Sequence, residues 1–143
     1  MVQKNLSLVV LIVVVFVLGF WLGKTTVSRA EGKKRVFELR TYTANEGKLE
    51  TLQARFRNHT TELFKKHGMT NIGYWSPKDA PLSQNTLVYI LAYPSREAAN
   101  KSWEEFKNDP KWKKVKQESE VNGELVKKVD SIYMDPTDYS PMK

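Results

Sequence analysis

The segment Thr86-Leu87-Val88-Tyr89-Ile90-Leu91-Ala92-Tyr93 decides the fold, because apolar side chains occupy nearly every position in it. A β-strand that lacks alternation between apolar and polar residues is covered on both of its faces. Helices of the same chain can cover one face of a sheet, but a chain of 143 residues has no further layer to offer the other face. The segment therefore predicts a central strand and argues for a partner subunit.

Strand and helix patterns alternate on either side of this segment. The expected strands cover about 36–42, 70–76, 86–93 and 126–134, and the expected helices cover about 45–67, 95–108 and 110–122. The order is βαββαβ, with the second helical region divided in two. It predicts an α+β, ferredoxin-like fold in which helices cover one face of a four-stranded antiparallel sheet. A domain of about 110 residues forms a core alone only marginally, whereas two copies that pair their bare sheet faces form a closed, two-fold dimeric α+β barrel.

Local signals mark the ends of the expected helices. Asn45 is suited to cap the first helix, and Gly68 stands where a residue with positive φ is needed at its end. Ser95 is placed to cap the next helix. Asp109-Pro110 predicts a restart, because proline at the first helical position follows an N-cap side chain.

The first expected helix has an inner stripe of residues spaced three and four apart. The stripe consists of Leu49, Leu52, Phe56, His59, Leu63 and His67. His59 and His67 lie about 12 Å apart by helix rise, which is too far for the two to share one metal ion. His59 is interpreted either as a core histidine with a satisfied hydrogen bond or as a lone general base in a cavity between the helix and the sheet.

The chain divides into three parts. Residues 1–30 are expected to be a transmembrane anchor or a signal peptide, residues 31–35 a basic linker, and residues 36–143 the α+β domain. Residues 6–23 carry no charge and would form about 27 Å of helix, close to the thickness of a bilayer core. The sequence therefore predicts a hydrophobic helix ahead of the domain.

Two interpretations of this N-terminus stay open. Two features favour a single-pass anchor: the apolar run is longer than the roughly 7–15 residues usual in a signal peptide, and Trp21 suits a membrane interface. A signal peptide is the alternative, because Ser28-Arg29-Ala30 provides a cleavage site, and cleavage at Ala30 would export the domain. An anchor would keep the domain in the cytoplasm, because the basic residues that follow the apolar run favour that side.

The composition excludes several classes of site. The chain contains no Cys, which excludes disulfides, thiolate nucleophiles and Cys-ligated zinc. Its net charge is +7, but part of that charge precedes the domain, and the modest remainder does not indicate nucleic acid as a partner. Phosphate-binding glycine motifs, a GxSxG elbow and an HExxH helix are missing. We therefore expect no metal and no cofactor.

Several segments together resemble one protein family. They are Phe37-Glu38-Leu39-Arg40-Thr41-Tyr42, Trp103-Glu104-Glu105-Phe106, Asp109-Pro110-Lys111-Trp112, and the ending Asp135-Pro136-Thr137-Asp138-Tyr139-Ser140-Pro141. In this order they are similar to NIPSNAP domains, over roughly residues 35–141. The resemblance implies a dimeric α+β barrel, an architecture also used by cofactor-free monooxygenases, muconolactone-type isomerases and haem-degrading enzymes. It supplies no catalytic residues, because NIPSNAP proteins have none established.

The candidate ligand-binding residues are Arg40, Tyr42, His59 and Trp75. Glu38, Arg40 and Tyr42 share one face of the first expected strand. They are interpreted as an ion-pair network at the subunit interface, because unpaired buried charge is costly, or as a ligand site. In the ligand site, Arg40 anchors an acidic or carbonyl group and Tyr42 donates a hydrogen bond. Trp75 is suited either to line a pocket for a flat apolar ligand or to fill the core.

These observations predict a membrane-tethered, NIPSNAP-like homodimer that binds a small apolar ligand or a protein partner without catalysis. The alternative is a cofactor-independent monooxygenase or isomerase that acts in a cavity around His59, Tyr42 and Trp75. A solvent-connected cavity at His59 would favour the enzyme, whereas a packed His59 without a cavity would exclude it.

Overall fold

The computed structural model of the protein describes residues 34–143. The expected anchor at residues 6–23, the expected cleavage at Ala30 and most of the basic linker lie outside the described residues. Within 34–143, no helix combines the length and the apolar character needed to cross a membrane.

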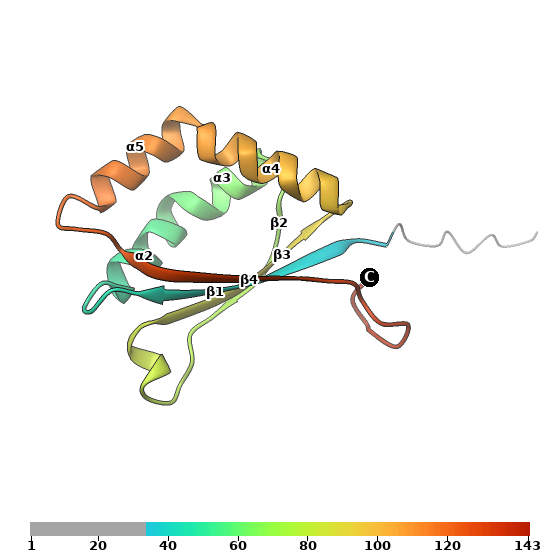
Figure 1. Ribbon diagram of the computed structural model, residues 1–143, viewed down its shortest axis with the longest axis horizontal. Helices are drawn as coiled ribbons and strands as arrows, with labels where there is room; N and C mark the ends of the chain where they lie inside the picture. Colours follow the sequence, from blue (N-terminus) through green and yellow to red (C-terminus); the bar gives the residue numbers. More distant parts are fainter. Residues whose placement is uncertain (1–33) are drawn as a thin grey trace, which may run out of the picture. The chain divides into compact units, whose positions relative to one another are not determined.

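Four strands form one antiparallel sheet (Figure 1). They are β1 (Val36–Ala44), β2 (Thr70–Trp75), β3 (Thr86–Tyr93) and β4 (Val126–Met134). Their order in the sheet is β2-β3-β1-β4, which places the apolar strand β3 in the interior as its sequence predicts. The α+β, ferredoxin-like architecture with an antiparallel sheet is thereby confirmed.

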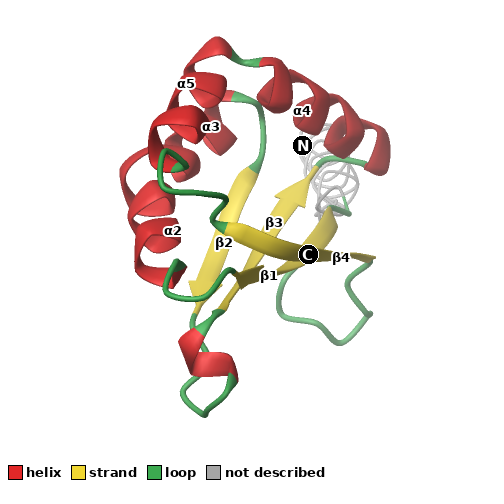
Figure 2. Cartoon of the chain, turned by 60° about the vertical axis from the view of Figure 1, so that its left-hand side comes forward, coloured by secondary structure: helices red, strands yellow, loops and turns green. Residues whose placement is uncertain are grey.

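The helices gather on one face of this sheet (Figure 2). They are α2 (Leu49–Arg55), α3 (Thr61–Lys66), α4 (Arg96–Asn108) and α5 (Pro110–Ser119). A π-helical turn, Phe56–Thr60, joins α2 to α3, and a 3₁₀ turn, Leu82–Gln84, lies in the β2–β3 connection. The single long helix expected from Asn45 to His67 is therefore interrupted by one wider turn.

Most of the predicted helix ends are confirmed. The hydroxyl of Ser95 accepts a hydrogen bond from the Ala98 N–H at 3.1 Å and caps α4. The carboxylate of Asp109 accepts one from the Lys111 N–H at 2.7 Å and caps α5, and Gly68 has the expected positive φ of 77°. The cap predicted at Asn45 is wrong, because its amide donates to the Glu124 carbonyl at 2.8 Å instead.

The register of β1 against β3 separates two kinds of residue. On the helix-covered face, Glu38 pairs with Leu91 and Arg40 pairs with Tyr89. On the opposite face, Leu39 pairs with Ile90. The charged residues of β1 thus point toward the helices of their own chain together with Tyr42, whereas Phe37 and Leu39 point away from them.

The hydrophobic core lies between the sheet and the helices and is largely aromatic. Phe64 on α3 stands in its middle, with ring centroids 6.0 Å from Tyr89, 5.4 Å from Trp103 and 4.9 Å from Phe106. Edge-on and tilted pairs of this kind add specific stabilisation to the area that the rings bury. The helix-covered face therefore has a complete core within one chain.

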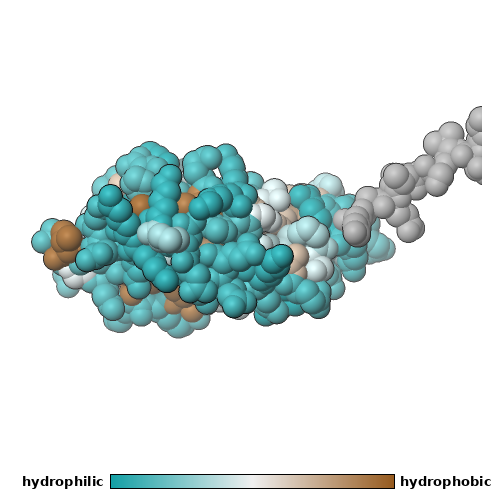
Figure 3. Space-filling view, turned by 90° about the horizontal axis from the view of Figure 1, so that it is seen from above, coloured by the Kyte–Doolittle hydropathy of each residue, from teal (hydrophilic) through white to brown (hydrophobic). Residues whose placement is uncertain are grey.

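The opposite face of the sheet is apolar and has little cover, and we call it the bare sheet face. It carries the half-buried side chains of Leu39, Val88 and Ile90 and the exposed side chain of Ile132. The segment after β4 turns back below the sheet (Figure 1) and lines a cavity of about 220 Å³ with Phe37 and Ile90. The surface seen from the side of the helices is mostly hydrophilic, with a few hydrophobic residues among the hydrophilic ones (Figure 3).

Candidate ligand cavity

Glu38 is fully buried beneath α4 and accepts four hydrogen bonds. Its Oε1 accepts from Arg40 Nη1 at 2.6 Å and from the Ser131 hydroxyl at 2.7 Å. Its Oε2 accepts from the Tyr93 hydroxyl at 2.6 Å and from Trp103 Nε1 at 2.7 Å. Burial alone raises the pKa of Glu38, but these four donors outweigh burial and hold the pKa below its usual value. The carboxylate is therefore ionised and saturated with donors.

Arg40 follows Glu38 on the same face of β1 because alternate residues of a strand point the same way. Its guanidinium lies 4.1 Å from the ring centre of Trp103 and 5.5 Å from that of Tyr42. Burial lowers the pKa of Arg40, but Tyr42, Tyr89 and Glu38 raise it by a larger amount. The net effect is a raised pKa, which favours the charged form. Arg40 is therefore a permanent cation held between aromatic rings.

The interpretation of this network as a subunit-interface feature is wrong. Glu38 receives its hydrogen bonds from β1, β3, β4 and α4 of the same chain. A buried charge needs partners on every side, and here one chain provides all of them. The network is a structural element of the helix-covered face.

A cavity of about 370 Å³ opens beside this network, between the sheet and the helical layer. We call it the helix-side cavity. Six aromatic residues line it: Tyr42, Phe56, Phe64, Trp103, Phe106 and Trp112. Arg40 and Arg55 contribute its cationic groups in the interior, and Lys107 and Lys116 line it from exposed positions. It combines the aromatic walls of a small-molecule site with several charged lining residues.

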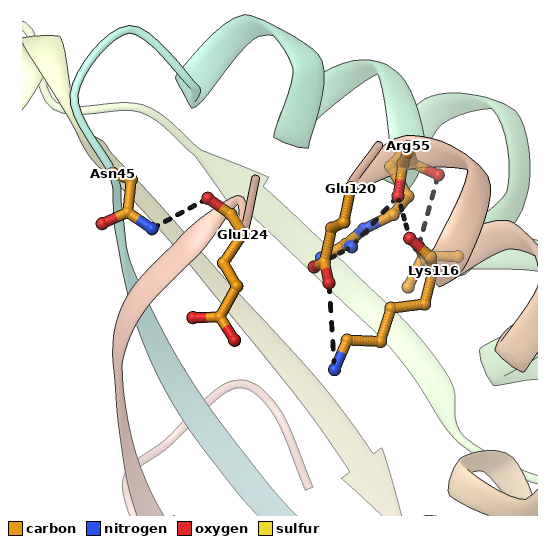
Figure 4. Close-up of polar contacts among 7 residues, drawn as sticks. Asn45, Arg55, Lys116, Glu120 and Glu124 are labelled. Carbon is orange, nitrogen blue, oxygen red and sulfur yellow. Dashed lines mark hydrogen bonds and ion pairs between the residues drawn. The ribbon is translucent and has the colours of Figure 1, made fainter. Parts of the chain in front are cut away.

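Arg55 enters this cavity from the end of α2 (Figure 4). Its Nη1 donates to Glu120 Oε1 at 2.9 Å and to the Ser119 hydroxyl at 3.3 Å. Its guanidinium lies 5.1 Å from the ring centre of Trp112. Glu120 also lies 3.9 Å from Lys116 Nζ, so its carboxylate forms ion pairs with both Arg55 and Lys116.

Two donors at the cavity have no partner within the described chain. They are the Nε groups of Arg40 and Arg55, both buried. The Arg55 side chain is only 4% exposed. A buried donor without an acceptor is energetically costly, and the two Nε groups have almost no accessible surface, so they represent unused hydrogen-bonding capacity beside the cavity and do not themselves face into it.

His59 does not face this cavity, and its predicted place on the inner stripe is wrong. The side chain is exposed, whereas Thr60 is 1% exposed and lines the cavity. The π-helical turn causes the exchange, because the Thr61 N–H donates to the Phe56 carbonyl five residues earlier. The Thr60 hydroxyl is satisfied by the Arg55 carbonyl at 3.2 Å. The cavity thus contains a threonine where a histidine was expected.

Trp75 also lies apart from Arg40 and Tyr42. It sits at the end of the edge strand β2, opposite Val88, and is 51% exposed. Its indole lies over Gly73, where an added Cβ would come within 2.6 Å of the ring. Of the four predicted ligand-binding residues, the structure brings only Arg40 and Tyr42 together in the helix-side cavity.

The Asp109-Pro110 segment has a structural role in addition to capping α5. Asp109 Oδ2 accepts from Lys66 Nζ at 2.6 Å and contacts His67 Nε2 at 2.7 Å. The hydrogen bonds from Lys66 and His67 hold the pKa of Asp109 well below its usual value. This carboxylate therefore ties the end of α3 to the start of α5.

Sequence reasoning missed Arg55 as a site residue. Arg55 directly precedes Phe56, which was placed on the inner stripe, but a charged residue next to such a stripe is usually solvated. The signal that identifies it is the group of possible partners on α5, Ser119 and Glu120. That group can be recognised only when α2 and α5 are placed side by side.

The sequence model of the NIPSNAP family matches residues 37–141 of the chain. A NIPSNAP family protein of unknown function from Agrobacterium tumefaciens has 21% sequence identity and a TM-score of 0.67, and the match covers 78% of this chain and 96% of that one. No functionally curated protein matches the chain.

Two oxygenases share the fold at lower similarity. A monooxygenase from the gene ActVA-Orf6 of Streptomyces coelicolor, solved in complex with the ligand nanaomycin D, has 14% identity and a TM-score of 0.53 over 76% of this chain and 92% of that one. SnoaB, a cofactor-independent oxygenase from Streptomyces nogalater, has 11% identity and a TM-score of 0.52 over 76% and 98%. At these identities the likeness concerns the fold alone. The family match extends over the whole described domain, and the chain therefore belongs to the NIPSNAP family.

Proposed function

We propose that this NIPSNAP domain is a homodimeric module that binds a small, largely apolar ligand in the helix-side cavity of each chain. The observation that carries the proposal is the cavity itself, about 370 Å³ in volume and lined by aromatic rings. Ligand pockets in proteins range from about 300 to 1,000 Å³ and combine apolar walls with a few polar groups. Here the polar groups include the guanidinium groups of Arg40 and Arg55.

The proposed partner in the dimer is a second copy of the chain, packed against the bare sheet face. Leu39, Val88, Ile90 and Ile132 together give this face an apolar surface, and soluble proteins rarely leave such a surface in water. Two copies paired in this way form a closed, isologous arrangement. The helix-side cavity lies on the other side of the sheet, so dimer formation leaves it open to a ligand.

Native mass spectrometry of the full-length chain, purified gently from the cells that express it, tests this function. We expect a dimer that carries additional small-molecule mass. Val129→Phe, which enlarges a 41% exposed side chain lining the cavity, should remove that mass. The matched control is Val121→Phe, at a 76% exposed position outside the cavity, which should retain it. Wild-type protein without additional mass would contradict the proposal.

A cofactor-independent oxygenase is the second candidate. It is supported by the aromatic-lined cavity and by the fold shared with SnoaB, which is described as such an enzyme. Its expected general base, His59, is exposed and outside the cavity. Glu38, the buried carboxylate nearby, already accepts four hydrogen bonds and is poorly suited to take a proton. The binding module is therefore the function that the geometry supports best.

A membrane tether at residues 6–23 also belongs to the proposal, on the strength of an uncharged apolar run of bilayer length. An uncleaved anchor should keep the full-length chain in the membrane fraction after extraction at alkaline pH. A mature chain that begins at Glu31 and appears in the soluble fraction would instead indicate cleavage at Ala30 and export.

A further inference from the structure

We infer that the helix-side cavity binds aromatic carboxylic acids, with the ring among its aromatic side chains and the carboxylate facing its arginines. The inference rests on the proposed function and gives it a ligand class.

The walls favour a flat, aromatic ligand. Phe56, Phe106 and Trp112 line the cavity from three helical segments, and Phe106 and Trp112 lie 4.5 Å apart between ring centres. Offset and edge-on contacts between rings stabilise an aromatic guest beyond the area that it buries. A volume of about 370 Å³ lies near the lower limit for ligand pockets and suits a compact ring system of one or two rings.

The two arginines that line the cavity favour an acceptor oxygen on that ligand. Arg40 and Arg55 each have one Nη group bound to a glutamate. These pairings fix the two guanidinium groups before a ligand arrives, so little side-chain entropy is lost on binding. A carboxylate accepts from a guanidinium more strongly than a neutral oxygen does, because the bond is charge-assisted.

The charges around the cavity favour an anion over a neutral guest. Four cationic side chains line it, Arg40, Arg55, Lys107 and Lys116, against two carboxylates, Glu120 and Glu124. Glu120 is held by Arg55 and lies near Lys116, as Figure 4 shows. A neighbouring cavity of about 460 Å³ shares Arg40, Trp103 and Lys107 and adds Arg96 together with the carboxylates Glu38 and Glu104. The excess of cations that favours an anion therefore comes from the helix-side cavity itself.

Calorimetric titration of the full-length protein with 2-naphthoate and with its neutral analogue 2-naphthamide tests the inference. The two probes have the same ring system and differ in charge. We expect 2-naphthoate to bind at least about tenfold more tightly, with an advantage that shrinks at high salt because the exposed lysines are screened.

Two substitutions locate the effect. Lys107→Gln should weaken binding of 2-naphthoate about two- to fivefold and leave 2-naphthamide unchanged, whereas Lys113→Gln, at an exposed position on α5 outside the cavity, should change neither. Arg55→Lys keeps the charge but removes the guanidinium group, and should weaken 2-naphthoate about tenfold. If Arg55→Lys fails to fold, the comparison of Lys107→Gln with Lys113→Gln, measured with both probes, still tests whether the carboxylate binds in this cavity.

The outcomes separate the ligand class from the proposed function. Tighter binding of the acid that is abolished by Val129→Phe and retained in Val121→Phe supports both. Equal binding of acid and amide, with both lost in Val129→Phe, overturns the carboxylate inference and leaves the binding function standing. Failure of both probes to bind, or binding that Val129→Phe leaves unchanged, overturns the inference and removes the support for this cavity as the site.

Discussion

The two faces of the sheet differ in what covers them. The helix-covered face contains the ion pair of Glu38 and Arg40, satisfied by donors from three strands and one helix. The bare sheet face presents Leu39, Ile90 and Ile132 with little cover from the described chain. Both faces also carry apolar residues, but only the helix-covered face packs them into a core with its own chain, around Phe64. The buried charges therefore lie where the chain supplies a second layer, and the apolar patch lies where it supplies little cover.

The largest expected effect concerns the covered face. Glu38→Ala leaves the buried Arg40 without its carboxylate, and loss of one partner from a buried ion pair costs about 3–5 kcal/mol. Urea denaturation of the variant should show a loss of this size. Glu118→Ala removes an exposed carboxylate from α5 and should change the free energy of unfolding by less than about 0.5 kcal/mol. Similar losses for the two variants would mean that the buried network contributes little.

A comparable change on the bare face should affect assembly instead. Leu39→Asp places a charge on both halves of the proposed interface, and each buried leucine contributes about 1.5–3 kcal/mol. The dimer dissociation constant, measured by sedimentation, should therefore rise at least about a hundredfold. Val121→Asp, at an exposed position in the turn before β4, should leave it unchanged. A dimer that withstands Leu39→Asp would place the interface elsewhere.

The third prediction is a pH dependence at Asp109, which ties α3 to α5. The pKa of Asp109 is lowered in the folded protein by Lys66 and His67, so its ionised form stabilises the fold. That contribution is present above the unfolded value of about 3.9 and is lost as the pH falls through the lower folded value. Asp109→Asn should therefore have a lower melting temperature at neutral pH.

The difference between wild type and Asp109→Asn should narrow as the pH falls below about 4. Asparagine can still cap α5, so the narrowing reports the charge of Asp109 and not the cap. Asp79→Asn, in the exposed β2–β3 loop, serves as the control and should follow the wild-type profile. A difference that stays constant with pH would rule out the charge as the cause.

The smallest predicted effect tests the π-helical turn. Thr60→Ala removes a buried hydroxyl that donates to the Arg55 carbonyl, and should cost about 1 kcal/mol. His59→Ala alters an exposed side chain and should stay within about 0.5 kcal/mol of wild type. Chemical denaturation of the two variants compares adjacent positions directly. A larger loss of stability for His59→Ala than for Thr60→Ala would mean that His59, and not Thr60, lies on the inner side of the helix.

Much of the fold follows from local patterns in the sequence. The apolar run of β3 predicts a central strand because both of its faces must be covered, and Ser95 and Asp109-Pro110 mark helix starts through side chains that accept backbone N–H groups. These signals depend on only a few neighbouring residues, so they can be recognised in the sequence without knowledge of tertiary contacts. The family resemblance, carried by the segments at both ends of the domain, agrees with the match over residues 37–141.

The site was predicted less completely, for physical reasons. Alternation places Glu38 and Arg40 together but does not say which face the helices cover. A helical repeat of 3.6 residues allows either His59 or Thr60 to follow Phe56 on the inner side, and the π-helical turn selects Thr60. Arg55 is identified only through Ser119 and Glu120, more than sixty residues later in the chain.

The indole of Trp75, which lies over Gly73 at the edge of the bare sheet face, gives the protein an optical reporter. Among the tryptophans of the described domain, Trp103 is buried and Trp112 is half-buried, while Trp75 is half in water. A partner that covers the neighbouring Val88 would take this indole out of water and shift its fluorescence emission to shorter wavelength. A ligand in the helix-side cavity would instead alter the emission of Trp103 and Trp112, so two emission signals distinguish assembly from binding without an added label.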